Sequence, residues 1–483
     1  MSVVNDIADL TGDFARSLRG AATDLLYPSL RLGVTGLSRS GKTVFTTSLV
    51  HHLMGGRDNL PAFRAAAEGR IRRARLTHQP DDTVPRFPYE SHIRSLVEER
   101  RWPGSTTQIS ELRLDIEYER KGGWRSGPDN LVLDIVDYPG EWLLDLALIE
   151  ASYAEWSQKT IAASRRYDRA DTAAFWLAHL DELDPAAPAD ELVAERASDL
   201  FKEYLLALHA KPQAVATMPP GRFLMPGDLA GAPALTFAPL AIAPGEPITE
   251  GSLAKLMERR FDAYKHHVVR PFFRDHFQRI DRQIVLVDVL SALDAGPAAL
   301  AELEDALDQV LLAFRTGRNS LLSRIFSPRA DRVLFAATKA DHIHHTQHDR
   351  LEALLRFLVA RATRRTEASG ARVGSLALAS VRATRETTVR DGFDILKAVA
   401  GMPEAGEHVG DELFDGTGEA VIFPGELPED ASSVIRGAIE PGSLRFPRFR
   451  PPEMTGGAAS RFEDLPHIRL DRALEFLIGD RLS

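Results

Sequence analysis

The stretch Gly36-Leu37-Ser38-Arg39-Ser40-Gly41-Lys42-Thr43 matches the pattern G-x-x-x-x-G-K-[ST] at every position. An apolar run over residues 30–35 predicts a strand before it, and residues 42–54 predict a helix after it. This is the context that the pattern requires for phosphate binding. The two glycines let backbone N–H groups converge on phosphate oxygens, and the helix N-terminus adds partial positive charge. The stretch therefore predicts a nucleotide-binding α/β core rather than a chance Gly-rich turn.

Two side chains of this predicted phosphate loop carry specific chemistry. Lys42 is expected to reach the β- and γ-phosphates and neutralise their charge during catalysis, and Thr43 is expected to give its hydroxyl to Mg²⁺. The residues expected to bind nucleotide here are Gly36, Ser38, Arg39, Ser40, Gly41, Lys42, Thr43 and Val44.

The flanking sequence predicts a sheet with helices on both faces. Residues 109–118 alternate apolar and polar side chains, and the apolar run 131–137 follows a Gly/Pro-bearing turn, so the two predict an antiparallel hairpin. An Arg-rich stretch before this hairpin reads as helical. Further strand signals, separated by helical patterns, lie at 284–287, 333–336 and 376–379. Strands that alternate with helices predict a mostly parallel sheet.

A second anchor directly follows the apolar strand. Asp137-Tyr138-Pro139-Gly140 gives D-x-x-G, in which Asp137 can hold Mg²⁺ through water. The N–H of Gly140 can bond a γ-phosphate and change position when that group leaves. Alone the motif would be an ordinary turn, but downstream of a phosphate loop it predicts a nucleotide sensor.

A third anchor, Thr338-Lys339-Ala340-Asp341, ends the strand at 333–337. A carboxylate at Asp341 can accept both N1–H and the exocyclic amine of guanine, which adenine does not offer, while the Lys339 stem packs along the base. If this motif is incidental, the alternative is an ATP-using P-loop ATPase or phosphotransferase.

The order of these motifs resembles the Ras-like P-loop GTPase superfamily. Segments 137–142, 264–277 and 282–293 resemble a narrower group, the YcjX-type family of bacterial stress-associated GTP-binding proteins. The resemblance implies a Ras-like fold with a large all-helical insertion, binding of GTP and GDP, and Mg²⁺-dependent hydrolysis. It also implies a nucleotide-state switch in bacterial stress response.

The same resemblance assigns further residues. Ser380 and Val381 would lie against the base, and Thr107, in preference to Thr106, would close on Mg²⁺ and the γ-phosphate. Glu141 stands where related proteins often carry the Gln that orients the attacking water, and Ser38 replaces a Gly in the loop. Both departures predict slow intrinsic hydrolysis, for which a partner could supply an Arg; Arg39 is a candidate within this chain, although a solvated loop Arg is the preferred interpretation of that residue. If hydrolysis is abolished, the alternative is a nucleotide-bound scaffold at the membrane.

The expected division of the chain has six parts. They are an N-terminal amphipathic helix (1–29), the first part of the GTPase core (30–141), a helical insertion (142–282), the second part of the core (283–399), a Gly/Pro-rich insertion (400–460) and a closing C-terminal helix (461–483).

Composition limits the remaining choices. The chain has 483 residues, no cysteine and a formal net charge of −10, which excludes thiol catalysis and thiolate metal sites and argues against nucleic acid as the main partner. No apolar run approaches the ~20 residues of a membrane span. We expect a cytoplasmic protein with an unknown protein effector. Two possibilities stay open: the effector is a membrane protein, and this chain makes peripheral contact with the inner face of the membrane. A basic patch at Arg64, Arg70, Arg72, Arg73 and Arg75 is the candidate for that contact.

Two weaker signals remain. Among His342, His344, His345 and His348, the pairs 345/348 and 344/348 would share a helix face as metal ligands, but no carboxylate at a compelling spacing completes a site. Residues 445–450, Arg-Phe-Pro-Arg-Phe-Arg, interleave basic and aromatic side chains as single-strand nucleic-acid binders do. We expect this segment to pack its Phe side chains on the protein instead.

Overall fold

The computed structural model describes residues 29–37, 39–55, 59–104, 108–121, 127–210, 219–226, 229–243, 245, 247–312, 330–367, 370–435, 443–454 and 465–483. Ser38, Thr106, Thr107 and the predicted N-terminal helix up to residue 28 lie outside these ranges.

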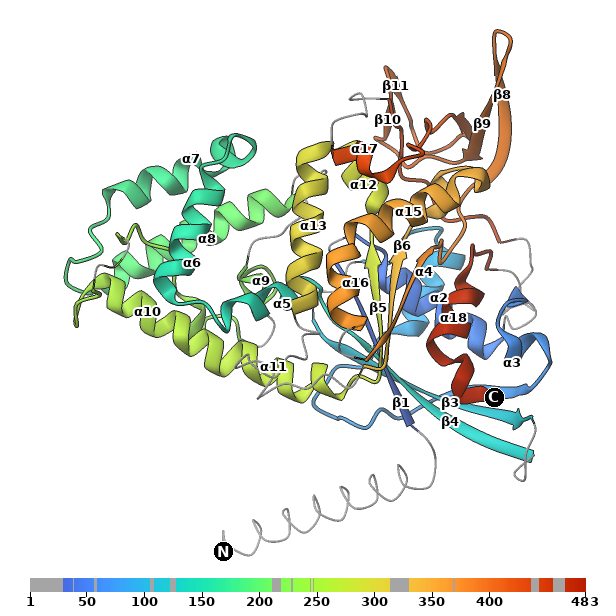
Figure 1. Ribbon diagram of the computed structural model, residues 1–483, viewed down its shortest axis with the longest axis horizontal. Helices are drawn as coiled ribbons and strands as arrows, with labels where there is room; N and C mark the ends of the chain where they lie inside the picture. Colours follow the sequence, from blue (N-terminus) through green and yellow to red (C-terminus); the bar gives the residue numbers. More distant parts are fainter. Residues whose placement is uncertain are drawn as a thin grey trace, which may run out of the picture.

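A seven-stranded sheet forms the centre of the protein (Figure 1). Its strands are β1 (Ser29–Gly36), β2 (Ile71–Thr77), β3 (Ser110–Arg120), β4 (Gly127–Asp137), β5 (Arg282–Val287), β6 (Arg332–Ala337) and β7 (Arg372–Ala377). They are ordered β2-β3-β4-β1-β5-β6-β7. From β4 to β7 all neighbours are parallel, whereas β3 pairs antiparallel with both β2 and β4. The prediction of a mixed α/β fold with a mostly parallel sheet is confirmed.

Part of the stretch before the hairpin that was predicted to be helical is a strand. It contains α3 (Arg64–Ala67) and α4 (Tyr89–Val97), but the arginines at 72, 73 and 75 lie on β2 at the edge of the sheet. Arg72 pairs with Glu119 of β3, and Arg75 Nη2 lies 2.9 Å from Asp115 Oδ2. These cross-strand charge pairs stabilise an edge strand. A register shift next to Ile71 breaks the strict alternation by which a strand is recognised.

Helices cover both faces of the sheet because successive strand residues point to opposite sides. On β5, Ile284 and Leu286 pack with α2 (Lys42–Met54) and α18 (Leu470–Ile478) in one apolar cluster. Val285 and Val287 pack on the other face in the cluster that includes α13 (Pro297–Leu312) and α15 (His348–Leu358). The remaining elements of this core are α4 (Tyr89–Val97), α12 (Val289–Asp294), α16 (Ala360–Glu367) and the 3₁₀ helices η7 (Ala340–His342), η8 (His345–Gln347) and η9 (Gly479–Leu482).

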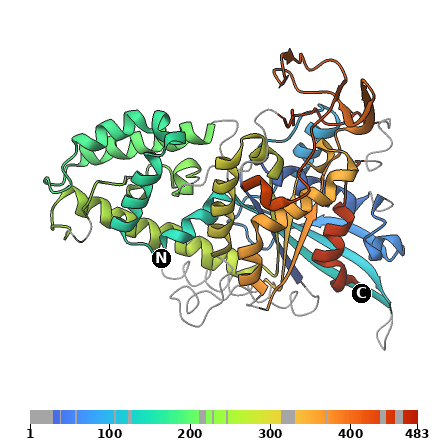
Figure 2. The same ribbon diagram turned by 45° about the horizontal axis from the view of Figure 1, so that its top comes forward.

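The described part of the long connection between β4 and β5 contains helical elements separated by loops, and four of its helices, α6, α7, α8 and α10, lie together beside the sheet in both views (Figures 1 and 2). The elements are α5 (Glu141–Leu144), η2 (Asp145–Leu148), α6 (Tyr153–Ser164), α7 (Tyr167–Glu182), α8 (Glu191–Ala210), α9 (Gly221–Leu224), η4 (Pro233–Leu235), α10 (Leu253–Tyr264), the π-helix η5 (Lys265–Val269), α11 (Arg270–Asp275) and η6 (Phe277–Arg279). Aromatic rings form the interior of this part: Trp156 stacks on Phe261 and meets Phe201 and Phe237 edge-on.

The C-terminal part builds a second, smaller sheet. Its strands are β8 (Arg385–Asp391), β9 (Asp394–Gly401) and β12 (Ala420–Ile422), and it is accompanied by β10 (His408–Val409), β11 (Glu412–Leu413) and α17 (Ala431–Ile435). The hairpin of β8 and β9 was not predicted, and the expected boundary at 399/400 falls inside β9.

None of the helices within the described ranges combines the length and apolar character that crossing a bilayer requires.

Candidate nucleotide-binding site

A cavity of about 790 Å³ lies at the carboxyl ends of β1, β6 and β7. In sheets of this kind, ligands bind at that edge because the loops leaving parallel strands converge there. Predicted site residues from the first and third anchors, together with Glu141 directly after the second, line the cavity. They are Arg39, Ser40, Gly41, Lys42, Thr43, Val44, Glu141, Thr338, Lys339, Asp341, Ser380 and Val381.

Three other predicted residues, Gly36, Asp137 and Gly140, lie behind this lining. A Cβ added at Gly36 would lie 2.4 Å from Leu286 O, and one added at Gly140 would lie 2.2 Å from Gly36 O. Only glycine allows such close approach of backbone to backbone. The turn of the second anchor therefore rests directly on the predicted phosphate loop.

The predicted phosphate loop turns into α2 at Gly41, whose φ of 83° is readily adopted only by glycine. Lys42 is 7% exposed, and its Nζ donates to Gly36 O at 2.7 Å. This hydrogen bond holds the ammonium across the loop, with the first N–H groups of α2 beside it. A lysine and a helix N-terminus at one point give a strongly anion-attracting end to the cavity.

Oxygen donors suited to Mg²⁺ lie next to this loop. Thr43 is the second residue of α2 and is 6% exposed. Asp137 ends β4, is 1% exposed and pairs in register with Val34 of β1. Hydroxyl and carboxylate oxygens are the hard ligands that Mg²⁺ prefers, so the donor set fits this ion. Thr43 Oγ1 donates to Gly104 O at 3.1 Å, which brings the chain that leads toward Thr107 to the same place.

Glu141 is an acidic residue beside the predicted phosphate loop, at the end of the cavity that we call the phosphate end. It begins α5, lines the cavity and is 1% exposed, and neither of its carboxylate oxygens has a hydrogen-bond partner within the described part of the chain. Burial lowers the pKa of His209, near the end of α8, and the negative charge of Glu141 opposes that shift. The positive charges of Arg39 and Lys42 lower it further. The end of α8 thus lies within the electrostatic field of the phosphate end.

The third anchor is held rigidly. Lys339 adopts a positive φ of 59° and forms an ion pair with Asp288 at the end of β5. Burial alone would raise the pKa of Asp288, but Lys339 and hydrogen bonds from Ser291 hold it below its ordinary value. Asp341 is 5% exposed, and its Oδ2 accepts a hydrogen bond from Ala383 N at 2.8 Å. The Asp341 carboxylate is therefore fixed in orientation in the wall of the cavity.

Ser380 and Val381 lie between this anchor and α2. Ser48 Oγ, on α2, donates to Ser380 O at 2.6 Å. Val381 packs with Leu96 and Leu465 in a small apolar cluster. These contacts hold the loop after β7 against the helix that carries Lys42.

Comparison with known proteins places the chain in a family. The model of the YcjX-like family, DUF463, matches residues 30–482. The chain belongs to the YcjX-like family. It is 38% identical over 469 residues to a protein of Escherichia coli (strain K12) named "Ras-like GTPase YcjX", covering 94% of this chain and 96% of that protein. It is 34% identical over 485 residues to a protein of the same name from Shewanella oneidensis, covering 94% and 95%. The family predicted from the sequence is confirmed.

In this member of the YcjX-like family, part of the cavity wall consists of residues that were not predicted from the sequence to belong to the site. The C-terminal part contributes Glu404, Ala405, Asp415, Gly416, Thr417, Arg448, Phe449 and Arg450, and Arg100–Gly104 and Met225 complete the wall. Phe449 is buried against Val399 and Ile422, as expected for the Arg-Phe-Pro-Arg-Phe-Arg segment, and Trp102 Nε1 donates to its carbonyl oxygen at 2.6 Å. The interleaved basic and aromatic pattern was the signal that could have located this wall.

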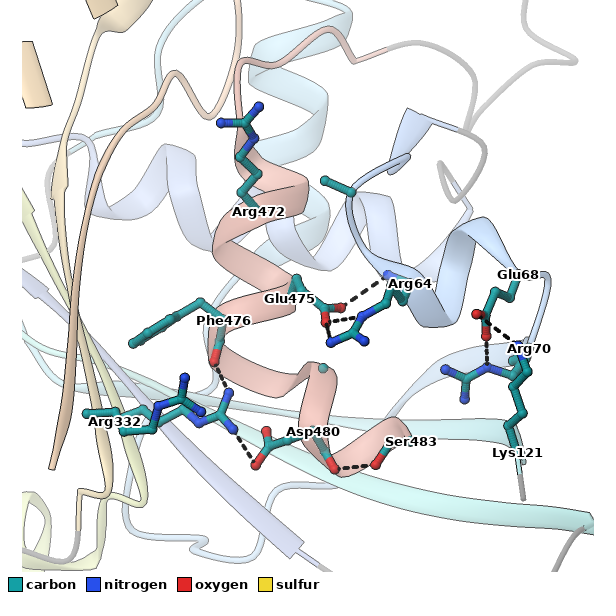
Figure 3. A pocket seen from close by; sticks show the side chains of 13 residues that line it. Arg64, Glu68, Arg70, Lys121, Arg332, Arg472, Glu475, Phe476, Asp480 and Ser483 are labelled. Atoms are coloured by element: carbon teal, nitrogen blue, oxygen red, sulfur yellow. Dashed lines mark hydrogen bonds and ion pairs between the residues drawn. The ribbon is translucent and has the colours of Figure 1, made fainter. Parts of the chain in front are cut away.

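A second cavity of about 790 Å³ lies beside α18 and α3 (Figure 3). It includes Arg332, which begins β6, so it adjoins the opposite, amino end of the sheet strands. Arg64 pairs with Glu475, and both Arg70 and Lys121 pair with Glu68. The basic patch predicted around these arginines is therefore neutralised in large part by neighbouring carboxylates.

Proposed function

We propose that this protein binds GTP and GDP in the first cavity and hydrolyses GTP with the help of Mg²⁺. The observation that carries the proposal is that the predicted phosphate loop and the Thr338–Asp341 anchor line one cavity. Its volume of about 790 Å³ suits a nucleotide-sized ligand. The name "Ras-like GTPase YcjX" of two relatives that match nearly the full chain supports the same activity.

Within this proposal each anchor has a distinct task. Lys42 and the N-terminus of α2 neutralise the β- and γ-phosphates, and Gly140 N–H senses the γ-phosphate. Thr43 and Asp137, with Thr107, would hold Mg²⁺, which when bound supplies charge stabilisation for the transferred phosphoryl group. Asp341 accepts hydrogen bonds from guanine, while Lys339, Ser380 and Val381 enclose the base.

We expect hydrolysis to be slow. Glu141 is buried at the phosphate end, where a carboxylate repels a γ-phosphate. The same burial favours a second candidate function, a nucleotide-bound scaffold with little turnover. A GTPase releases phosphate in a single-turnover experiment, whereas the scaffold does not.

The residues that follow Gly140 contact the helices between β4 and β5, which we regard as an insertion domain. These contacts support a nucleotide-state switch that acts through those helices. Asp145 in η2, just after α5, accepts hydrogen bonds at 2.6 Å from Gly221 N and from Tyr264 Oη. The Arg222 guanidinium lies 3.4 Å from the centre of the Trp142 ring. A movement at Gly140 would therefore reach α9 and α10, where we place the effector surface. The role in bacterial stress response rests on the sequence resemblance.

Competition for a fluorescent GDP analogue tests the base preference. We expect GTP and GDP to displace it and ATP to fail at the same concentration; equal displacement by ATP would refute the proposal and favour an ATPase. Asp341→Asn should shift preference from guanine to xanthine nucleotides, because the amide can donate to the xanthine oxygen. Unchanged preference in this variant would remove Asp341 from the base site.

A further inference from the structure

Three potential metal ligands meet beside the third anchor, although the sequence separates them. His344 and His345 lie at the start of η8, and Glu386 lies on β8. One ligand atom from each falls within 4.8 Å of the other two. His345 Nδ1 is 2.6 Å from Glu386 Oε2, and His344 Nε2 is 3.8 Å from the same oxygen.

The surrounding hydrogen bonds orient all three side chains. His344 Nδ1 accepts a hydrogen bond from Thr346 N at 3.4 Å and lies 3.0 Å from Thr346 Oγ1, and these contacts hold the ring with Nε2 facing Glu386. With Nδ1 as an acceptor, Nε2 of the neutral ring carries the proton, which a metal ion would displace. Glu386 Oε1 accepts from the backbone N–H of His345 at 3.0 Å, which leaves Oε2 between the two rings.

We propose that His344, His345 and Glu386 form a binding site for a divalent transition metal ion of the Zn²⁺, Co²⁺ and Ni²⁺ class. Two imidazole nitrogens and one carboxylate oxygen suit these ions, with water completing the coordination, whereas Mg²⁺ prefers oxygen donors alone. The site is therefore chemically distinct from the one expected at Thr43 and Asp137.

The required adjustment is small. Tetrahedral ligands about 2.1 Å from Zn²⁺ lie about 3.4 Å apart. His345 Nδ1 and Glu386 Oε2, at 2.6 Å, must separate by about 0.8 Å, and His344 Nε2 must approach by about 0.4 Å. The His345 side chain is 63% exposed and can turn to make this room, and a small shift of the 27% exposed Glu386 carboxylate toward the 8% exposed His344 closes the other gap.

The other histidines of the cluster are engaged elsewhere. His348 Nε2 lies 2.9 Å from Ala340 O, and the His342 ring packs edge-on against Phe449. Helical spacing suggested the pairs 345/348 and 344/348 as metal ligands. The fold instead brings His344 and His345 to a carboxylate. Glu386 supplies the missing ligand from a strand about forty residues away.

A metal ion here would restrain the loop that carries Asp341. His344 follows Asp341 by three residues, and Glu386 follows Thr384, whose hydroxyl donates to Asp341 O. A metal ion that joins these two segments would slow the opening of the cavity around Asp341, where we place the guanine base, and would therefore slow GDP release. This second step rests on the proposed nucleotide function, whereas metal binding itself does not.

Calorimetry with Zn²⁺ tests the site on full-length protein without an affinity tag, in excess Mg²⁺ and GDP. We expect one tight equivalent in the wild type and an affinity at least about tenfold lower in Glu386→Gln and in His345→Ala. His267→Ala, an exposed histidine of η5, is the matched control and should bind like the wild type. Co²⁺ should show visible bands of an imidazole-ligated ion that both site variants lose.

Wild-type affinity in both site variants would overturn the proposal, as would the absence of a stoichiometric site. Neither substitution touches the core, because His345 is exposed and Glu386 lies on the outer small sheet, so thermal unfolding should be unchanged without metal. Zn²⁺ should slow GDP release in the wild type and not in Glu386→Gln. Intact metal binding with unchanged GDP release would refute the coupling alone, and absent GDP binding would refute the proposed function and leave the metal site standing.

Discussion

Gly140→Ala should weaken nucleotide binding because its new methyl group meets the backbone of the predicted phosphate loop. The added Cβ would lie 2.2 Å from Gly36 O and 2.6 Å from Gly36 C, whereas ordinary contact begins at 3.4 Å. The loop must therefore move by about 1.2 Å, and no flexible side chain is available to give way. Overpacking of this kind costs about 1–3 kcal/mol. If that cost falls on the bound loop geometry, GDP affinity drops by about 5- to 150-fold.

Titration of the fluorescent GDP analogue measures this loss directly, and thermal unfolding with and without GDP shows whether the fold or the binding absorbs the strain. Gly418→Ala is the matched control, because a Cβ there meets nothing within 4 Å and its φ is not in the left-handed region. We expect the control to bind like the wild type. If Gly140→Ala binds GDP with wild-type affinity and unfolds at the wild-type temperature, the inferred contact between the two motifs is wrong.

Three further substitutions test the site and its link to the helices. Lys42→Ala should weaken GTP binding by at least about tenfold, since a hydrogen bond to a charged group is worth about 1.5–3 kcal/mol; equal affinity in the same titration would exclude the lysine from the phosphate site. Glu141→Gln should raise single-turnover phosphate release by about tenfold, equivalent to about 1.4 kcal/mol of removed repulsion, and an unchanged rate would show that this charge does not limit hydrolysis. Burial raises the pKa of Asp145 from 3.8 to about 6. Because its pKa is raised in the folded state, Asp145 contributes about 3 kcal/mol to the free energy of unfolding at pH below about 4. This contribution is lost as the pH rises through 6. Urea unfolding at pH 4.5 and 7 should show this loss in the wild type and not in Asp145→Asn; parallel behaviour of the two would exclude Asp145 as its source.

Local patterns predicted the central sheet well where the strand periodicity was unbroken. The alternation over 109–118 and the apolar run 131–137 correspond to β3 and β4, and the short buried runs correspond to β5 and β6. β2 was missed because a register shift interrupts its pattern.

The predicted site residues share one feature, which is that each belongs to a short motif whose neighbours set its geometry. Gly41, Lys42 and Thr43 belong to one turn and one helix, so a local pattern was enough to predict that they lie together, and they line one cavity. The opposite wall depends on contacts such as Trp102 with Phe449, 347 residues apart, and Glu386 meets His345 across 41 residues. Such pairings follow from the topology of the small sheet, which no local pattern specifies.

A chain of close backbone contacts offers a route by which nucleotide state could reach the helices between β4 and β5. Gly140 lies against Gly36 O, and a Cβ added at Gly221 would lie 2.2 Å from Glu141 O. Contacts this tight cannot be compressed further, so a shift of the D-x-x-G turn must displace α9 or break its contact with α5. Asp145 opposes the break, because its hydrogen bonds tie η2 to Gly221, Arg222 and Tyr264. Displacement of α9 therefore costs less free energy than breaking its contact with α5. The glycines at 140 and 221 allow the close backbone contacts through which the movement would pass.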